Sequence, residues 1–255
     1  MPATKSTRKR SLLFEITARI VIALLAIGIF ALVRPEYVGA AQGNYRRYVS
    51  TPGLISSYMQ QNSVRKLQIG SGDNDFKGWL NTEYEPHEGQ AFLDAIEHFP
   101  LPDSSFNYIF SEHVIEHFSY WDGQKMLKES YRVMKPGGRI RLVTPNLDKL
   151  LALSHQPTEE MQRYMREKMA WHKWWPKTPD PAALIVSMES HDFGHQFLYN
   201  PAILGQCLEK AGFRNVTIHE MGVSTDPQLA NLEVRPGFPG EWAKRYESMA
   251  LEAEK

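Results

Sequence analysis

The chain has 255 residues, and its 29 lysines and arginines are balanced by 29 aspartates and glutamates. This length allows one good-sized α/β domain with appendages, and the neutral balance gives no overall positive charge that would attract nucleic acid, so we expect no nucleic-acid partner. A single cysteine, Cys207, excludes a disulfide framework within the chain.

An apolar stretch follows a basic tail, residues 1–10, and runs from Ser11 to Val33. Its strictly uncharged part is 14 residues long, residues 20–33, which is shorter than the roughly 20 residues that span a bilayer. Pairing of Glu15 with Arg19 would extend it. We expect residues 11–34 to form a hydrophobic membrane-anchor helix. A cleaved signal peptide and an ordinary buried helix are the alternatives.

The rest of the chain divides by composition. Residues 35–62 are predicted to be a polar linker, and residues 63–222 the main domain, with an insertion at 155–195 that could cover a site. Residues 223–255 are predicted to be a tail, a loop rich in proline and glycine followed by a polar helix.

The main domain is organised around residues 66–83. A short apolar run ends at Gly70-Ser71-Gly72, and a second short run ends at Glu83. This pattern predicts a strand, a glycine turn and a second strand with an acid at its tip. Glycines tolerate positive φ and let the backbone approach a ligand, while a carboxylate at the next strand's tip can accept both ribose hydroxyls. Such a turn is typical of an α/β domain that holds an adenosine ligand.

The turn does not favour a pyrophosphate. Position 75 is aspartate where a dinucleotide loop has its third glycine, and Asp73 adds a second negative charge. Glu83 follows Gly70 by 13 residues, where roughly 20 is usual for the acid. The segment between them is therefore too short for a crossover helix.

Strands and helices alternate further along the chain. The later strands are predicted at Ala91–Leu93 with Asp94 at the end, Phe106–Phe110, Arg139–Thr144 and Val216–Ile218. The helices are predicted at Trp121–Met134 with a stop at Lys135–Gly138, Asn146–Leu153, Glu159–Ala170 and Asn200–Ala211 with Gly212 as its stop. The alternation predicts an α/β, Rossmann-like and mainly parallel sheet with helices on both faces.

Six segments carry a family resemblance: IGSG (69–72), Glu83, Leu93-Asp94, LPDSSFNYIFSEHVIEH (101–117), YRVMKPGGRIRLVTPN (131–146) and GHQFLY (194–199). Together they resemble the class I methyltransferases that use S-adenosylmethionine, in particular a methyltransferase type 11-like subgroup found near glycan and cell-envelope genes. The resemblance covers roughly residues 64–218 and implies S-adenosylmethionine as the cofactor.

The resemblance also implies a cofactor site. The glycine turn would hold the cofactor, Glu83 its ribose, and Asp94 its adenine amine, while the backbone around Ser111 would flank the methionine. The implied cofactor-binding residues are Gly70, Ser71, Gly72, Glu83, Asp94, Ser111 and His113.

Methyl transfer is an in-line displacement at carbon, in which catalysis is largely positioning. A hydroxyl acceptor also needs a general base, a role that histidine suits near neutral pH. The catalytic candidates are His113 and His195, with Glu112 as second choice. Three tryptophans of the insertion could stack on a sugar, namely Trp171, Trp174 and Trp175.

We therefore expect an S-adenosylmethionine-dependent methyltransferase that O-methylates a glycan, a lipid-linked sugar or another small acceptor. It would associate with a membrane through residues 11–33, with its catalytic domain in the cytoplasm, where the cofactor is made. One alternative is a non-catalytic cofactor-binding module of the same fold. Another is a zinc hydrolase, because His113–His117 spells the H-x-x-E-H motif. Since that segment directly follows a strand, we expect no metal ligands.

Overall fold

The computed structural model describes residues 16–17, 19–25, 27–28, 35–173, 175–233 and 240–255. The chain divides into two compact units at residue 50. In the first unit, the helix α2 (Pro35–Tyr45) continues into a π-helical turn, η1 (Arg46–Ser50).

Among the described residues, no helix is long and apolar enough to cross a membrane. The hydrophobic helix predicted over residues 11–34 is therefore not found, and 13 of those residues, 11–15, 18, 26 and 29–34, lie outside the described part. Membrane association through residues 11–33 stays a prediction.

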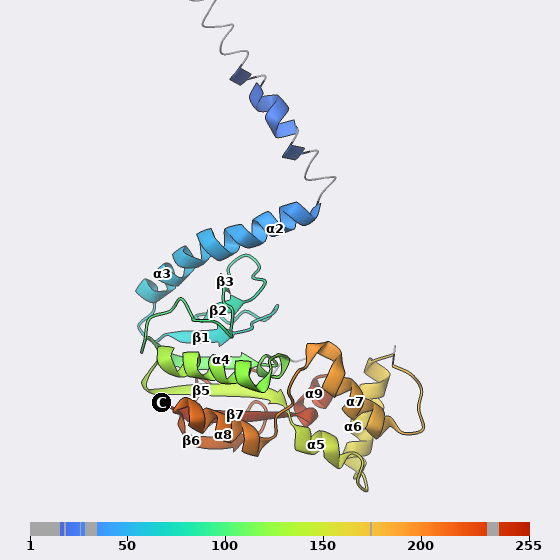
Figure 1. Ribbon diagram of the computed structural model, residues 1–255. Coiled ribbons are helices and arrows are strands. Elements are labelled where there is room, and N and C mark those ends of the chain that lie inside the picture. Colours follow the sequence, from blue (N-terminus) through green and yellow to red (C-terminus); the bar gives the residue numbers. More distant parts are fainter. Residues whose placement is uncertain (1–15, 18, 26, 29–34, 174, 234–239) are drawn as a thin grey trace, which may run out of the picture. The chain divides into compact units, whose positions relative to one another are not determined.

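The second unit is built on a seven-stranded sheet with the order β3-β2-β1-β4-β5-β7-β6 (Figure 1). The first five strands pair in parallel, whereas β7 is antiparallel to both neighbours. This confirms the predicted Rossmann-like, mainly parallel sheet. The strands are β1 (Lys66–Ile69), β2 (Leu80–Glu83), β3 (Ala91–Phe92), β4 (Phe106–Glu112), β5 (Met134–Pro145), β6 (Arg214–His219) and β7 (Ser248–Glu254).

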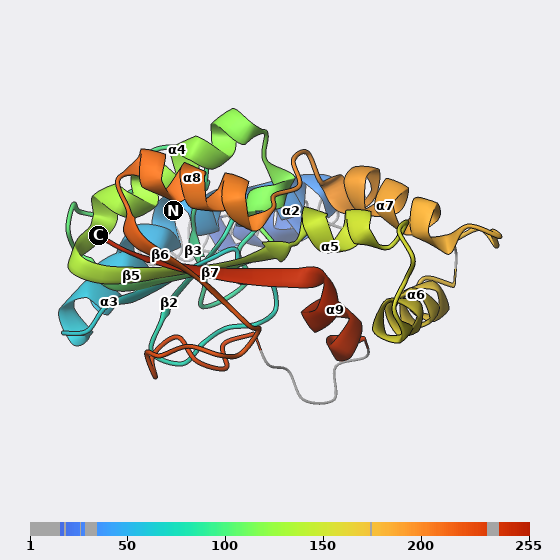
Figure 2. The same cartoon turned by 90° about the horizontal axis from the view of Figure 1, so that it is seen from below.

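Two amphipathic helices, α4 (Tyr120–Val133) and α8 (Pro201–Ala211), cover one face of the sheet (Figure 2). The helix α8 begins and ends as its sequence predicts, whereas the predicted stop of α4 at residues 135–138 is part of β5. Asn200 caps α8 by accepting the N–H of Ile203 at 2.9 Å, and Gly212 ends it at φ 111°, a left-handed conformation that glycine adopts at little cost.

The core of this face consists of apolar residues that alternate along the strands. Leu67 and Ile69 of β1, Ile109 of β4, and Ile140 and Leu142 of β5 pack with the helices. On the opposite face, Phe110 and Val143 pack under loop residues, among them Trp79 and Leu229.

The prediction for the C-terminal tail is wrong at its end. A short helix, α9 (Glu241–Glu247), is followed by β7, which lies inside the sheet between β5 and β6. The sequence SMALEAE is rich in good helix formers, yet Met249, Leu251 and Ala253 face one side of the sheet and pack in its core. Burial between two strands thus overrides the intrinsic helix propensity.

Residues 35–62, predicted as a linker, are mostly helical in the structure. Within the second unit, α3 (Thr51–Gln61) packs Leu54, Ile55 and Tyr58 against the sheet's core. The Thr51 hydroxyl also accepts the N–H of Phe92 at 2.8 Å, so α3 is part of the domain.

The insertion forms a helical layer beyond the carboxyl ends of the parallel strands (Figure 1). It has its own apolar cluster, in which Leu150, Tyr164, Ile185 and Ala243 are buried. Because α9 contributes to this cluster and continues directly into β7, these two elements connect the insertion to the sheet. Its elements are α6 (Glu159–Trp171), α7 (Pro181–His191) and the short η3 (Asp192–Gly194), and α5 (Leu147–Ala152), which precedes the insertion, packs with them.

Candidate active site

The sheet reverses its winding between β1 and β4. From β1 the chain continues outward to β2 and β3, and from β4 it continues the other way to β5. Ligands of open α/β sheets bind beyond the strands' carboxyl ends at such a point. A cavity of about 720 Å³ lies there. Its lining residues are Gly70, Ser71, Gly72, Asp73, Asn74, Glu83, Glu112, His113, Val114, His117, Phe118 and Lys244.

The glycine turn forms one wall of this larger cavity. Gly70 and Gly72 have φ values of 70° and 52°. A side chain at Gly70 would also collide with Val114, so the turn and the end of β4 approach each other because residue 70 has no Cβ. The N–H groups of Gly70 and Ser71 both donate to the Thr82 carbonyl at 3.0 Å, which fastens the turn to β2.

Glu83 lies at the tip of β2 and lines the cavity, as predicted for a ribose ligand. Its carboxylate accepts the N–H of Gly72 at 2.9 Å and that of Tyr84 at 2.8 Å. Since a carboxylate can accept about four hydrogen bonds, capacity is left for hydroxyl donors.

Gln90 supports the turn, although no feature of its local sequence marked it. It is buried, and its amide donates to Ser71 Oγ at 2.8 Å, to the Gly72 carbonyl at 2.7 Å and to Asp75 at 2.8 Å. Only the pairing of β2 with β3 brings Gln90 to the loop.

The predicted residues at the end of β4 have different environments. Ser111 is buried within the strand, in register with Ile69 and Leu142, and does not line the cavity. Glu112 lines it and accepts a hydrogen bond from Lys244 Nζ at 2.6 Å. Asp94, beyond the edge strand β3, accepts the N–H of Ile96 at 3.2 Å and is not a lining residue.

His113 follows β4 in a left-handed conformation, with φ 53°. Its backbone N–H donates to the Val143 carbonyl at 2.9 Å, and its Nδ1 lies 2.9 Å from Glu116 Oε1. Non-glycine residues at positive φ are strained and often mark functional sites. The left-handed conformation of His113 redirects the chain from β4 into the 3-10 turn η2 (Ile115–His117).

Glu116 is fully buried behind His113. Burial raises the pKa of Glu116, but the hydrogen bond and charge of His113 outweigh it, so the pKa is lowered overall. The hydroxyl of Thr144 also donates to Glu116 at 3.0 Å. The ring of His113 is thereby held by a charged carboxylate.

A second cavity, of about 260 Å³, adjoins the first, and His113, His117 and Lys244 line both. The insertion and α9 supply the rest of its wall. Those residues are Lys168, Trp171, His172, Glu189, Phe193, His195 and Glu247.

The polar wall of this smaller cavity is a buried ionic cluster. Lys168 Nζ lies 2.6 Å from Glu189 and 2.6 Å from Glu247, and Tyr164 donates to Glu247 at 2.5 Å. Burial lowers the pKa of Lys168, yet the charges of Glu247 and Glu189 more than compensate, so the pKa is raised and the lysine stays charged.

Aromatic rings form another wall. His172 stacks on Trp175 with centroids 4.3 Å apart, and Trp171 and Phe193 also line the cavity. Trp175 is buried and does not line it, while Trp174 lies outside the described residues.

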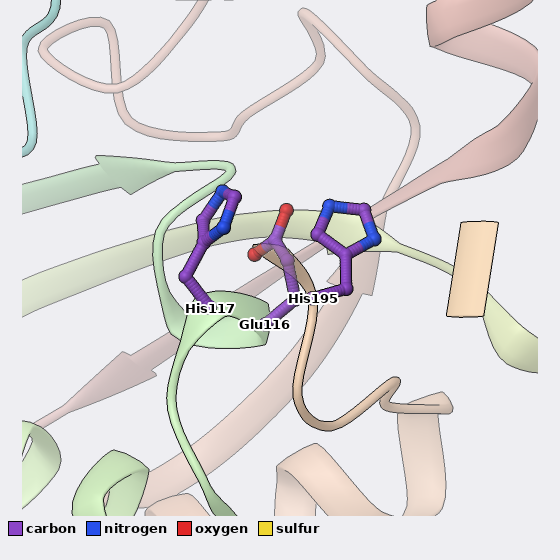
Figure 3. A group of neighbouring side chains, drawn as sticks. All are labelled: Glu116, His117 and His195. Carbon is purple, nitrogen blue, oxygen red and sulfur yellow. The ribbon is translucent and has the colours of Figure 1, made fainter. Parts of the chain in front are cut away.

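His195 lies beside η2, the turn that follows β4, as Figure 3 shows together with Glu116 and His117. Its Nδ1 lies 2.6 Å from the Glu189 carbonyl, and its ring packs edge-on against His117 with centroids 5.0 Å apart. The H-x-x-E-H segment is not a helix, because His113 is left-handed and η2 is a single 3-10 turn. The helical zinc-hydrolase geometry that the motif would need is therefore not formed.

Residues 52–142 match a family model described as a methyltransferase domain. The chain is also 43% identical over 47 residues to a protein of Mycolicibacterium smegmatis named "Probable S-adenosylmethionine-dependent methyltransferase". That alignment covers 18% of this chain and 18% of the relative.

Two solved structures are similar in fold. A SAM-dependent methyltransferase from Archaeoglobus fulgidus has a TM-score of 0.43 and 18% identity, with coverage of 90% of this chain and 99% of that one. An S-adenosylmethionine dependent methyltransferase from Mesorhizobium loti has a TM-score of 0.45 and 14% identity, with coverage of 80% and 96%. Residues 52–142 therefore carry a methyltransferase domain, and the relative aligned over 47 residues is named as one that depends on S-adenosylmethionine.

Proposed function

We propose that this protein transfers the methyl group of S-adenosylmethionine to a hydroxyl oxygen of a small acceptor, namely the sugar of a glycan or a lipid-linked sugar. One observation carries the proposal: a cavity beside the glycine turn adjoins a second, smaller cavity, and the two share the wall of His113, His117 and Lys244. Methyl transfer needs such a donor site and acceptor site in contact.

In the larger cavity, Glu83 would accept the ribose hydroxyls, and the turn of Gly70, Ser71 and Gly72 would face the methionine part of the cofactor. Glu112 and His113 line the same cavity, and the sulfonium would sit beside them. Asp94 and Ser111 do not line this cavity, so direct contact of either side chain with the cofactor has less support than contact by Glu83.

His113 is the best placed general base. It lines both cavities, and a proton on Nδ1 is favoured by Glu116, which leaves Nε2 as the acceptor nitrogen. Nε2 lies 3.2 Å from the Ser248 hydroxyl, whose place the acceptor's hydroxyl would take. Nε2 would take the acceptor's hydroxyl proton while the oxygen attacks the methyl carbon. The cofactor would supply the methyl group and leave as S-adenosylhomocysteine, with the electron pair of the broken C–S bond on sulfur. Glu112, already paired with Lys244, is less suited.

The smaller cavity suits a neutral, polyhydroxylated acceptor. Its aromatic wall, with Trp171 and Phe193, can stack on a sugar face, and the carboxylates of Glu189 and Glu247 can accept hydrogen bonds from hydroxyl groups. Anchoring through residues 11–33, which stays a prediction, would favour a lipid-linked form of the sugar.

The experiment has two arms. The purified chain is titrated with S-adenosylmethionine and S-adenosylhomocysteine, and methyl-labelled cofactor is incubated with lipid, glycan and protein fractions. We expect sub-millimolar binding and label in the glycan or glycolipid fraction. Failure to bind either molecule would refute the proposal, and label found only in protein would refute the acceptor class.

A variant pair tests the base. His113→Gln should lower kcat about 100-fold or more, because general bases contribute roughly 10²–10⁴-fold. His155→Gln, on an exposed residue after α5, should leave kcat unchanged. Cofactor affinity is the internal check, and an unchanged kcat in His113→Gln would assign the base elsewhere.

A further inference from the structure

Glu116, His117 and His195 bring three metal-ligating groups together. One ligand atom from each residue lies within 4.8 Å of the other two. Figure 3 shows the Glu116 carboxylate between the two imidazole rings. Two of the residues come from η2 and the third from the segment after η3, which is far away in the sequence.

The hydrogen bonds of these side chains leave lone pairs for a cation. The Glu189 carbonyl can only accept, so Nδ1 of His195, 2.6 Å away, carries the proton and Nε2 keeps its lone pair. Glu116 accepts from Thr144 at Oε2 (3.0 Å) and has Nδ1 of His113 2.9 Å from Oε1, which together use two of the roughly four lone-pair sites of a carboxylate. A histidine that donates its other N–H to a carbonyl, and a carboxylate held by a hydroxyl, are the usual second-shell contacts of metal ligands.

The backbone holds the two segments against each other. The N–H groups of Gln196 and Phe197 donate to the Glu116 carbonyl at 2.8 and 3.2 Å, and the Gln196 amide donates to the His117 carbonyl at 2.8 Å. Phe193 is left-handed at φ 61°, and Gly194 packs near Nδ1 of His117. Strained residues of this kind persist where the surrounding structure enforces them, often at functional sites.

We infer that Glu116, His117 and His195 bind one divalent transition metal ion, and that Zn²⁺ is the ion that this donor set suits best. Two neutral imidazoles and one carboxylate form the donor set of catalytic zinc sites, and nitrogen donors disfavour Mg²⁺. Around a tetrahedral ion with Zn–N of about 2.05 Å, ligand atoms are about 3.4 Å apart. Small side-chain rotations from the present spacing are therefore enough.

Three protein ligands leave one coordination position open. His117 and His195 line the smaller cavity, so the open position would face the acceptor. This last step rests on the proposed function, whereas metal binding itself does not. A bound ion would polarise a coordinated hydroxyl and orient it.

The test measures metal directly. The full chain is purified, stripped with a chelator, and titrated with Zn²⁺ by calorimetry, and Co²⁺ is added separately to record its visible spectrum. We expect one Zn²⁺ ion per chain, a Co²⁺ spectrum that indicates nitrogen ligands, and no comparable binding of Mg²⁺. His117→Ala and His195→Ala should each weaken Zn²⁺ binding more than about 100-fold. Thr144→Val, which removes a contact to a ligand, should weaken it about 10-fold.

His191→Ala is the matched control, because His191 is exposed at the end of α7 and outside the cluster. Equal loss of affinity in this variant, or no stoichiometric binding by the stripped wild type, would overturn the inference. Circular dichroism checks each fold, and Glu116→Gln replaces any alanine variant that fails to fold. S-adenosylmethionine titration of the stripped chain separates the two proposals, since cofactor binding without metal binding refutes only this one.

Discussion

On the proposed cofactor side of the site, the N–H of Gly72 donates to Glu83, 11 residues away in the sequence. On the proposed acceptor side, Lys168 donates to Glu247, 79 residues away. The first contact joins a turn to the adjacent strand through a backbone N–H. The second joins the insertion to the helix before β7 through a buried ion pair. The cofactor half is thus a local structure, and the acceptor half exists only once distant segments have packed.

The largest effect should come from the acceptor side. Lys168→Met leaves Glu189 and Glu247 buried without their cation, and breaking a buried pair costs about 3–5 kcal/mol of unfolding free energy. Urea unfolding measures the loss. Glu167→Gln, which removes the surface pair with Arg163 on the same helix, should cost less than about 1 kcal/mol. Equal costs would show that the cluster does not hold the insertion.

A glycine pair tests the cofactor side. Gly70→Ala combines a strained φ with a collision against Val114 and should cost about 2–3 kcal/mol of stability, with weaker cofactor binding. Gly72→Ala has a similar φ but no atom within 4 Å of the added Cβ, and should cost about 1 kcal/mol. Thermal unfolding and cofactor titration report both. Indistinguishable variants would mean that the close approach to Val114 is unimportant.

Glu83→Gln should act mainly on cofactor affinity. The amide loses the charge that favours hydroxyl and N–H donors, and hydrogen bonds to charged groups contribute about 1.5–3 kcal/mol, so the Kd for S-adenosylhomocysteine should rise roughly 10–100-fold. Glu85→Gln, on an exposed residue two positions further on, is the control. An unchanged Kd in Glu83→Gln would remove the ribose assignment.

The smallest effect is expected for Gln90→Met, which keeps the side chain's length but removes its donors to the turn. A lost neutral hydrogen bond costs about 1 kcal/mol, so the Kd for the cofactor should rise about 5-fold while the acceptor-side cluster is unaffected. A rise as large as that of Glu83→Gln would indicate that Gln90 contacts the ligand.

Local sequence was enough to predict most elements of the domain. Asn200 and Gly212 bracket α8 as expected, and the glycine turn with Glu83 lies at the predicted strand tips. These signals work because capping, turn conformation and strand alternation depend on residues a few positions apart. The same reasoning placed β7 in a helix, because Ala, Glu, Leu and Met favour helices in isolation.

The sequence by itself determined the sheet's parallel strands, the glycine turn that we propose holds the cofactor, and the methyltransferase resemblance of the region around it. The tertiary structure decided which side chains meet beyond that turn: Glu116 with His113, Lys168 with Glu189 and Glu247, and His117 with His195. The physical reason is the sequence separation of the residues that interact. Hydrogen bonds of a turn are encoded within a dozen residues, whereas a buried ion pair or a shared ligand set depends on where strand order and helix packing bring remote segments together.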